Sequence, residues 1–76
     1  MIDFDLIRSV AQDYRVLHNR FSGVVLVFEG SAYGWKDKLR NPEHESVGSI
    51  AVDPEGFLFE AKGKGYNSGA SCWVAM

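Results

Sequence analysis

The amino-acid sequence predicts an α+β fold: one N-terminal amphipathic helix packed on a four-stranded antiparallel sheet. Three observations support this prediction. Apolar residues recur at helical spacing over residues 3–21, a continuous apolar run follows at residues 24–28, and two β-prone segments flank the turn sequence DPEG at residues 53–56. A chain of 76 residues has room for one domain, so we expect residues 1–76 to form a single domain with a thin core.

The expected helix over residues 3–21 has an apolar stripe and a polar face. The stripe recurs at intervals of three and four residues and comprises Ile7, Val10, Tyr14, Leu17 and Phe21, widened by Leu6 and Ala11. The polar face carries Arg8, Gln12, Asp13, Arg15 and Asn19. Asp3 or Asp5 can accept hydrogen bonds from the first-turn amides, and Gly23 can take the positive φ that follows a helix end.

The β-prone segments follow the helix. The run from Val24 to Phe28 is apolar at every position, so this strand should be central or covered on both faces. DPEG should close a hairpin, because Pro54 suits the second position of the turn and Gly56 its last. Residues 63–69 contain three glycines and should form a loop before the final strand, SCWVAM. The side chains expected in the core are Val10, Tyr14, Leu17, Leu26, Phe28, Ile50, Phe57, Phe59 and Trp73.

Composition narrows the classes of function. Ten acidic against eight basic residues give a net charge of −2, whereas nucleic-acid binders usually carry a strong basic excess and DNA mimics a large acidic one. Cys72 is the single cysteine, which excludes an intramolecular disulfide and favours a cytoplasmic protein. The longest apolar run, VVLVF, is far shorter than a membrane span, so no membrane partner is expected.

The segment SAYGWKDKLRNPEHE, residues 31–45, joins two predicted strands and is the main candidate for a functional surface. It could form a short helical turn closed by Pro42. In one interpretation Trp35 anchors a connection whose charged residues are merely solvated. In the other, Leu39 and the Trp35 ring pack inward and the segment contacts a partner. The partner-binding residues would then be Tyr33, Trp35, Lys36, Lys38, Arg40, Lys64 and Tyr66.

The sequence contains no recognised catalytic or metal-binding motif. The EHE triplet at residues 43–45, even with His18 added, lacks a recognised ligand spacing, so we expect no metal and no cofactor. Cys72 lies in an apolar strand, where cysteine usually packs as a small hydrophobe rather than acting as a nucleophile with His18 or His44. GKGYNSG, residues 63–69, departs from the patterns of phosphate-binding loops. We therefore predict that the chain is not an enzyme.

A short N-terminal helix, the strand GVVLVFEG, the hairpin around VDPEG and the lack of an active-site constellation define a whole-chain profile. In this profile the sequence resembles the small anti-defence proteins of phages and mobile elements, of the anti-CRISPR and antirestriction type. The resemblance implies a compact domain that occludes a surface on a larger host protein or nucleoprotein complex, and it transfers no family residue to this chain. A non-enzymatic inhibitor of this kind is the leading functional prediction.

A nucleic-acid-binding accessory domain is the alternative. Cationic side chains at Lys36, Lys38, Arg40, Lys62 and Lys64 are interleaved with the aromatic residues Tyr33, Trp35 and Tyr66, which is the composition of a single-strand platform. Four acidic residues, Asp37, Glu43, Glu45 and Glu60, would weaken the field of such a platform. Separately, the uncharged final strand should lie at a sheet edge, so we also expect a homodimer formed through it.

Overall fold

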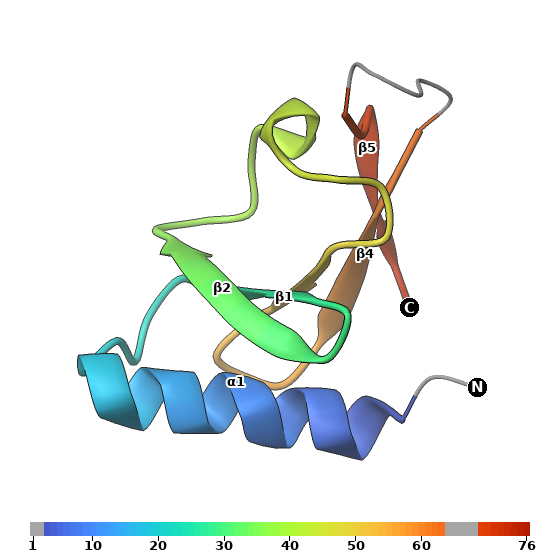
Figure 1. Ribbon diagram of the computed structural model, residues 1–76. Coiled ribbons are helices and arrows are strands. Elements are labelled where there is room, and N and C mark those ends of the chain that lie inside the picture. Colours follow the sequence, from blue (N-terminus) through green and yellow to red (C-terminus); the bar gives the residue numbers. More distant parts are fainter. Residues whose placement is uncertain (1–2, 64–68) are drawn as a thin grey trace.

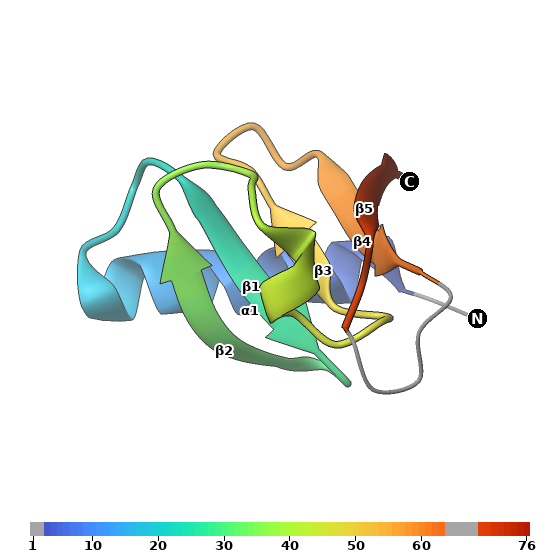
Figure 2. The same ribbon diagram turned by 90° about the horizontal axis from the view of Figure 1, so that it is seen from above.

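The computed structural model of this protein describes residues 3–63 and 69–76. Its elements, in chain order, are α1 (Phe4–His18), β1 (Val24–Phe28), β2 (Ser31–Lys36), the 3-10 helix η1 (Pro42–His44), β3 (Ile50–Val52), β4 (Leu58–Lys62) and β5 (Cys72–Ala75). The five strands form one antiparallel sheet in the order β2-β1-β3-β4-β5 (Figures 1 and 2). The predicted α+β class is confirmed. One strand more than expected is present, because residues 31–36 pair with β1 and are neither loop nor helical turn.

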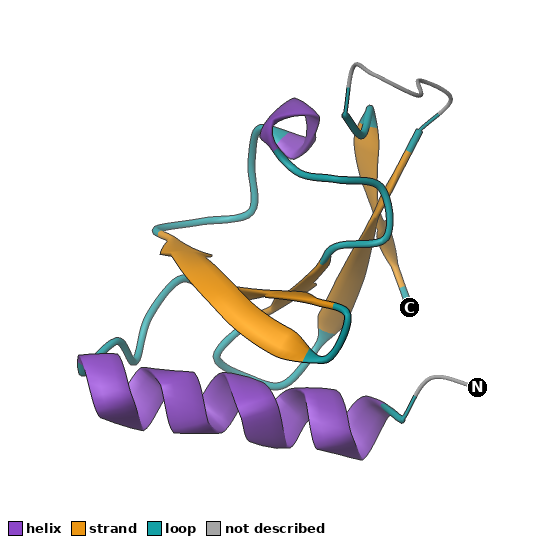
Figure 3. Cartoon of the chain, in the orientation of Figure 1, coloured by secondary structure: helices purple, strands orange, loops and turns teal. Residues whose placement is uncertain are grey.

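The sheet is covered on both faces. Figure 3 shows α1 beneath the sheet and η1, with its flanking segments, on the other side. The buried side chains on the α1 side are Ile7, Ala11, Val25, Val27, Ile50, Val52 and Leu58. On the opposite side Val24, Leu26 and Ala51 are buried, and Leu39, Phe59 and Trp73 pack against them. Because β1 supplies alternate residues to both clusters, its unbroken apolar run is explained.

The ends of α1 follow from two local signals. The Asp3 carboxylate accepts a hydrogen bond from the Leu6 amide at 3.1 Å and thereby caps the first turn. At the other end Asn19 takes a left-handed conformation, with φ of 55°, and its amide donates to the Arg15 carbonyl. The helix therefore ends at His18, three residues before the predicted boundary.

The buried face of α1 runs through Ile7, Ala11 and Arg15, a spacing of four residues. The sequence pattern places Arg15 on the polar face, and this prediction is wrong, because Arg15 is buried. Its guanidinium donates to four backbone carbonyls at 2.9–3.0 Å: those of Arg20, Ser22, Gly23 and Val52. Residues two apart in a helix point about 200° apart, so burying Arg15 turns Leu17 outward. Leu17 is 79% exposed, and its predicted place in the core is also wrong.

The hairpin predicted around DPEG is confirmed. The Gly56 amide donates to the Asp53 carbonyl at 3.1 Å, and Gly56 has φ of 89°. The Asp53 carboxylate accepts from the amides of Glu55 and Phe57 and so fixes the turn. Phe57 consequently lies in the turn and is exposed, which contradicts its predicted burial.

The remaining core predictions divide by degree of burial. Leu26 and Ile50 are buried as predicted. Five side chains are half-buried, namely Val10, Tyr14, Phe28, Phe59 and Trp73. In the part of the chain that the structure describes, no helix has the length and apolar content needed to cross a lipid bilayer.

Candidate functional site

The segment over residues 31–45 folds into β2, a connection and η1, and a β-bulge in β2 determines where Tyr33 points. Leu26 lies opposite Gly34 and Val27 opposite Ala32, so Tyr33 is an extra residue in the β1–β2 pair. Without the bulge, Tyr33 would share a face with Trp35, which packs on the α1 side. The bulge allows the Tyr33 hydroxyl to donate a hydrogen bond to Glu45 Oε1 beside η1.

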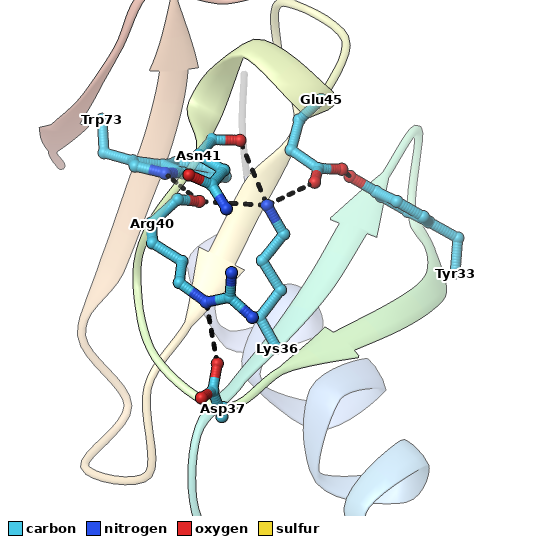
Figure 4. Close-up of polar contacts among 7 residues, drawn as sticks. All are labelled: Tyr33, Lys36, Asp37, Arg40, Asn41, Glu45 and Trp73. Carbon is cyan, nitrogen blue, oxygen red and sulfur yellow. Dashed lines mark hydrogen bonds and ion pairs between the residues drawn. The ribbon is translucent and has the colours of Figure 1, made fainter.

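The Lys36 ammonium lies inside this network (Figure 4). Its Nζ is 2.7 Å from Glu45 Oε2, and it donates to the carbonyls of Arg40 at 3.0 Å and Asn41 at 3.1 Å. The side chains of Lys36 and Glu45 are only 13% and 7% exposed. A partner-binding role for Lys36 predicts an outward-facing side chain, and this orientation is wrong. The three donors of its ammonium are all engaged within the chain.

The electrostatics of this network keep Glu45 charged and Tyr33 neutral. Burial alone would raise the pKa of Glu45, but hydrogen bonds from Lys36 and Tyr33, together with the charge of Lys36, hold it below its usual value. Burial and the hydrogen bond to Glu45 raise the pKa of Tyr33 to about 12. A general acid or base works best with a pKa near the working pH. Near neutral pH these two groups are therefore suited to holding the segment in place rather than to transferring protons.

A pocket of about 270 Å³ adjoins the network. Its lining comprises Phe28, Ser31, Tyr33, His44, Glu45, Ser46 and Ser49. The volume lies just below the range typical of small-molecule sites. Among the described residues, every deeply buried side-chain nitrogen or oxygen already has a hydrogen-bond partner. In the described part of the chain, the pocket therefore contains no deeply buried side-chain polar atom that lacks a hydrogen-bond partner and could bind a ligand instead.

The outer residues of the predicted contact surface are arranged around this network. Tyr33 is 47% exposed although its hydroxyl is bonded. Lys38 is exposed. Arg40 is also exposed, and its Nε donates to Asp37 Oδ1 at 2.9 Å, while its carbonyl accepts from Trp73 Nε1 at 3.3 Å. The structure therefore brings Tyr33, Lys36 and Arg40 into one network, with Lys38 beside it. Lys64 and Tyr66 lie outside the described residues.

Trp35 belongs to the opposite side of the sheet. Its ring is half-buried and packs against the α1-side cluster, and its Nε1 donates to the Ser22 carbonyl at 2.7 Å. The Arg20 guanidinium lies 4.6 Å from the ring centre. Leu39 packs inward as predicted, in the cluster on the other face. Trp35 and Leu39 thus anchor the segment to two different clusters, one on each face of the sheet.

The other candidate sites have these positions. Cys72 is exposed, not packed as a small hydrophobe, and its Sγ contacts the Lys62 carbonyl at 3.8 Å. The EHE triplet spans the end of η1, and only Glu45 of the three is buried. Within residues 3–63 and 69–76, no three side chains of His, Cys, Asp or Glu gather closely enough to bind a metal ion.

A second surface lies on α1, and sequence reasoning assigned it to the core. We call Leu6, Val10, Tyr14 and Leu17 the α1 flank; they recur at helical spacings of four, four and three residues. Val10 and Tyr14 are half-buried against the α1-side cluster, whereas Leu6 is 56% and Leu17 79% exposed. The other side of α1 faces the β3–β4 hairpin, where Arg8 Nε donates to the Gly56 carbonyl at 2.7 Å. The α1 flank therefore lies along the side toward β2.

The sequence carried a signal for this surface. The apolar stripe, widened by Leu6 and extended by Phe21, is broader than one helix–sheet contact can bury. In the structure Phe21 is also exposed, just beyond the end of α1.

Comparison with protein-family models, with curated proteins and with solved structures gives no match for this chain.

Proposed function

We propose that this chain is a small non-enzymatic protein-binding module that inhibits a larger host protein or nucleoprotein complex by occluding one of its surfaces. The proposed mode of action is that of the anti-defence proteins whose whole-chain profile the sequence resembles. The observation that carries the protein-binding part of the proposal is the α1 flank. Apolar side chains that are aligned along one helix and left in solvent are typical of surfaces that other proteins cover.

The flank lies on a helix that is held rigidly, as is typical of a protein contact surface. Leu6 and Leu17 project from a capped helix that is fixed to the sheet at both ends, by Arg8 and by Arg15. A rigid helix loses little conformational entropy when a partner covers it. Half-buried Tyr14 lies between the two leucines and supplies an aromatic side chain, the residue type enriched at binding hot spots.

The exposed part of the 31–45 segment is a second contact region in this proposal. Tyr33, Lys38 and Arg40 supply an aromatic ring and two cations at the surface, and the Lys36–Glu45 pair holds their backbone in place. Rim charges of this kind mainly steer the encounter with a partner. Lys36 and Trp35 support this region through internal contacts and would contribute little direct contact.

The nucleic-acid alternative has less support from the arrangement of charges. Lys36 pairs with Glu45, Arg40 with Asp37 and Lys62 with Glu60. Each pair reduces the local positive field that phosphate binding requires. Among the described cations of the predicted platform, Lys38 alone lies outside these three pairs, and it is next to Asp37. One lysine by itself makes a weak phosphate site.

The test is affinity capture from a lysate of the cells from which the chain comes, followed by mass spectrometry. The bait is the parent chain, a flank variant with Leu6→Glu and Leu17→Glu, and a matched control with Ser9→Glu and Gln12→Glu on exposed polar positions of the same helix. We expect one host complex to be retained by the parent and by the control and to be lost by the flank variant. Melting curves of all three establish that each is folded.

Two results would contradict the proposal. One is retention of the same complex by the flank variant at parental levels. The other is capture that disappears after nuclease treatment and weakens steeply with salt, since this would favour the nucleic-acid alternative. Inhibition is tested separately: the activity of the captured complex should fall when purified parent chain is added and should not fall with the flank variant.

A further inference from the structure

Strand β5 lies at one edge of the sheet (Figure 2), and its backbone groups point alternately toward β4 and away from it. The Met76 amide donates to the Leu58 carbonyl at 3.0 Å, and the β4–β5 register pairs Glu60 with Val74 and Ala61 with Trp73. In an antiparallel pair, hydrogen-bonded and non-hydrogen-bonded positions alternate. Positions 72, 74 and 76 therefore face β4, and the backbone amides and carbonyls of Trp73 and Ala75 point away from the sheet.

The two edges of this sheet differ in their protection. At β2 the edge is interrupted by the Tyr33 bulge, and a bulge hinders edge-to-edge pairing. Strand β5 is regularly paired along Cys72–Ala75 and carries no charge and no proline. In the part of the chain that the structure describes, no further strand pairs with it. β5 is thus the edge that remains open to another strand.

We propose that β5 pairs antiparallel with β5 of a second copy of this chain, about a two-fold axis that passes beside Val74. In this register Val74 lies opposite Val74 of the second copy, Trp73 opposite Ala75, and Cys72 opposite Met76. The outward amides and carbonyls of Trp73 and Ala75 then form about four hydrogen bonds across the axis. The two five-stranded sheets become one continuous sheet. This inference does not depend on the proposed function.

The side chains of β5 favour this register. It sets large Trp73 against small Ala75, whereas shifting the strands by one residue each would oppose two tryptophans. That shifted register would also bring Ser71 into the ladder, although the Ser71 amide already donates to the Lys62 carbonyl at 2.7 Å. Val74 and Met76 are 42% and 39% exposed, and pairing would cover both. At the axis Val74 occupies a non-hydrogen-bonded position, where facing side chains approach most closely.

Disulfide trapping tests the pairing and its register. In a Cys72→Ser background, Val74→Cys places the only thiol on the axis, where the Cα separation suits a disulfide. Ser9→Cys in the same background is the control, because Ser9 is exposed on α1. Under mild oxidation we expect the thiol at position 74 to give covalent dimer at least tenfold faster than the control thiol. Equal rates for the two would overturn the pairing, and faster trapping through Cys72 of the parent chain would overturn the register.

A second measurement needs no cysteine chemistry. Sedimentation equilibrium of the parent chain across a wide concentration range should show the mass of two chains at the upper end. Val74→Lys should return the chain to a monomer with an unchanged circular dichroism spectrum, because like charges would meet at the axis. Val16→Lys, the same substitution at an exposed valine on α1, should leave the dimer intact. A parent chain that stays monomeric throughout, or a Val74→Lys variant that dimerises like the parent, would refute the inference.

Discussion

The Lys36 ammonium lies 2.7 Å from Glu45 Oε2, and this ion pair joins the end of β2 to the residue that follows η1. Between the two residues the chain makes a short excursion that places Leu39 on the cluster of Val24, Leu26 and Ala51. The Lys36–Glu45 ion pair (Figure 4) therefore joins the two ends of the segment that carries Leu39 onto this cluster. An ion pair with so little solvent exposure is sensitive to the loss of either partner.

Lys36→Met should lower the free energy of unfolding by about 3 kcal/mol, because Glu45 would remain buried without its counter-charge. Lys38→Met is the matched control, since Lys38 is exposed, and it should change stability by less than about 0.5 kcal/mol. Urea titration measures both. Joint replacement of Tyr33, Lys36 and Arg40 by alanine should also be strongly destabilising, because Lys36 lies inside the network.

The same network predicts losses of stability in acid and in alkali. The pKa of Glu45 is lowered in the folded chain, so its contribution is present above its usual pKa of 4.5 and is lost as the pH falls through the lower folded value. The pKa of Tyr33 is raised from 10.0 to about 12, so its contribution is present below pH 10 and is lost as the pH rises from 10 to 12. Thermal melts across the pH range should show both losses.

Variants separate the two groups. Tyr33→Phe should flatten the loss above pH 10 relative to the parent, and Glu45→Gln should flatten the loss in acid. Tyr14→Phe keeps both groups of the network and should preserve the parental profile. An alkaline profile that is identical in the parent and in Tyr33→Phe would show that the hydroxyl of Tyr33 does not contribute to the pH dependence.

Arg15→Met should destabilise the fold by about 3 kcal/mol or more, because four backbone carbonyls would lose their donor in a buried site. Burial lowers the pKa of Arg15, but a guanidinium remains protonated at all ordinary pH values. Arg8→Met removes two exposed interactions, the hydrogen bond to the Gly56 carbonyl and the ion pair with Asp5, and should cost no more than about 1 kcal/mol. Equal costs at the two positions would contradict the anchoring role of Arg15.

Leu17→Ala should change the melting temperature little, since its side chain is 79% exposed. Ile7→Ala, a truncation of a similarly sized side chain in the buried face of the same helix, should cost about 2–4 kcal/mol. The helical stripe in the sequence predicted the opposite behaviour for Leu17. If calorimetry ranks Leu17→Ala as the more damaging change, the orientation of α1 described above is incorrect.

Gly23 and Gly30 both have positive φ, of 71° and 83°, and can therefore be compared. A methyl group added at Gly23 would lie 2.3 Å from the Lys36 carbonyl oxygen and 2.6 Å from the Trp35 ring, whereas at Gly30 it would meet nothing within 4 Å. Gly30→Ala should therefore cost about 1 kcal/mol from its conformation alone. Gly23→Ala should cost roughly 1–3 kcal/mol more, because the strands must move apart. Denaturant titration of the two variants measures the difference.

The sequence by itself determined the parts of this protein that local patterns encode. Asp3 capped the predicted helix, DPEG specified the hairpin, and the apolar run over Val24–Phe28 indicated a strand covered on both faces. The uncharged final strand was also correctly placed at an edge of the sheet. In each case the residues that define the feature are close together in the chain, so periodicity and turn chemistry were sufficient.

Only the tertiary structure decided which apolar face of α1 is buried and what residues 31–45 do. The Arg15 guanidinium donates hydrogen bonds to the carbonyls of residues 20, 22, 23 and 52. These bonds fix the rotation of α1 about its own axis and leave Leu17 exposed to solvent. Lys36 pairs with Glu45 in a fold in which β2 carries a bulge at Tyr33 and η1 precedes Glu45. A sequence pattern records that these side chains are charged. Whether a charge is solvated or buried depends on partners that are supplied by distant segments, and those partners exist only once the chain has folded.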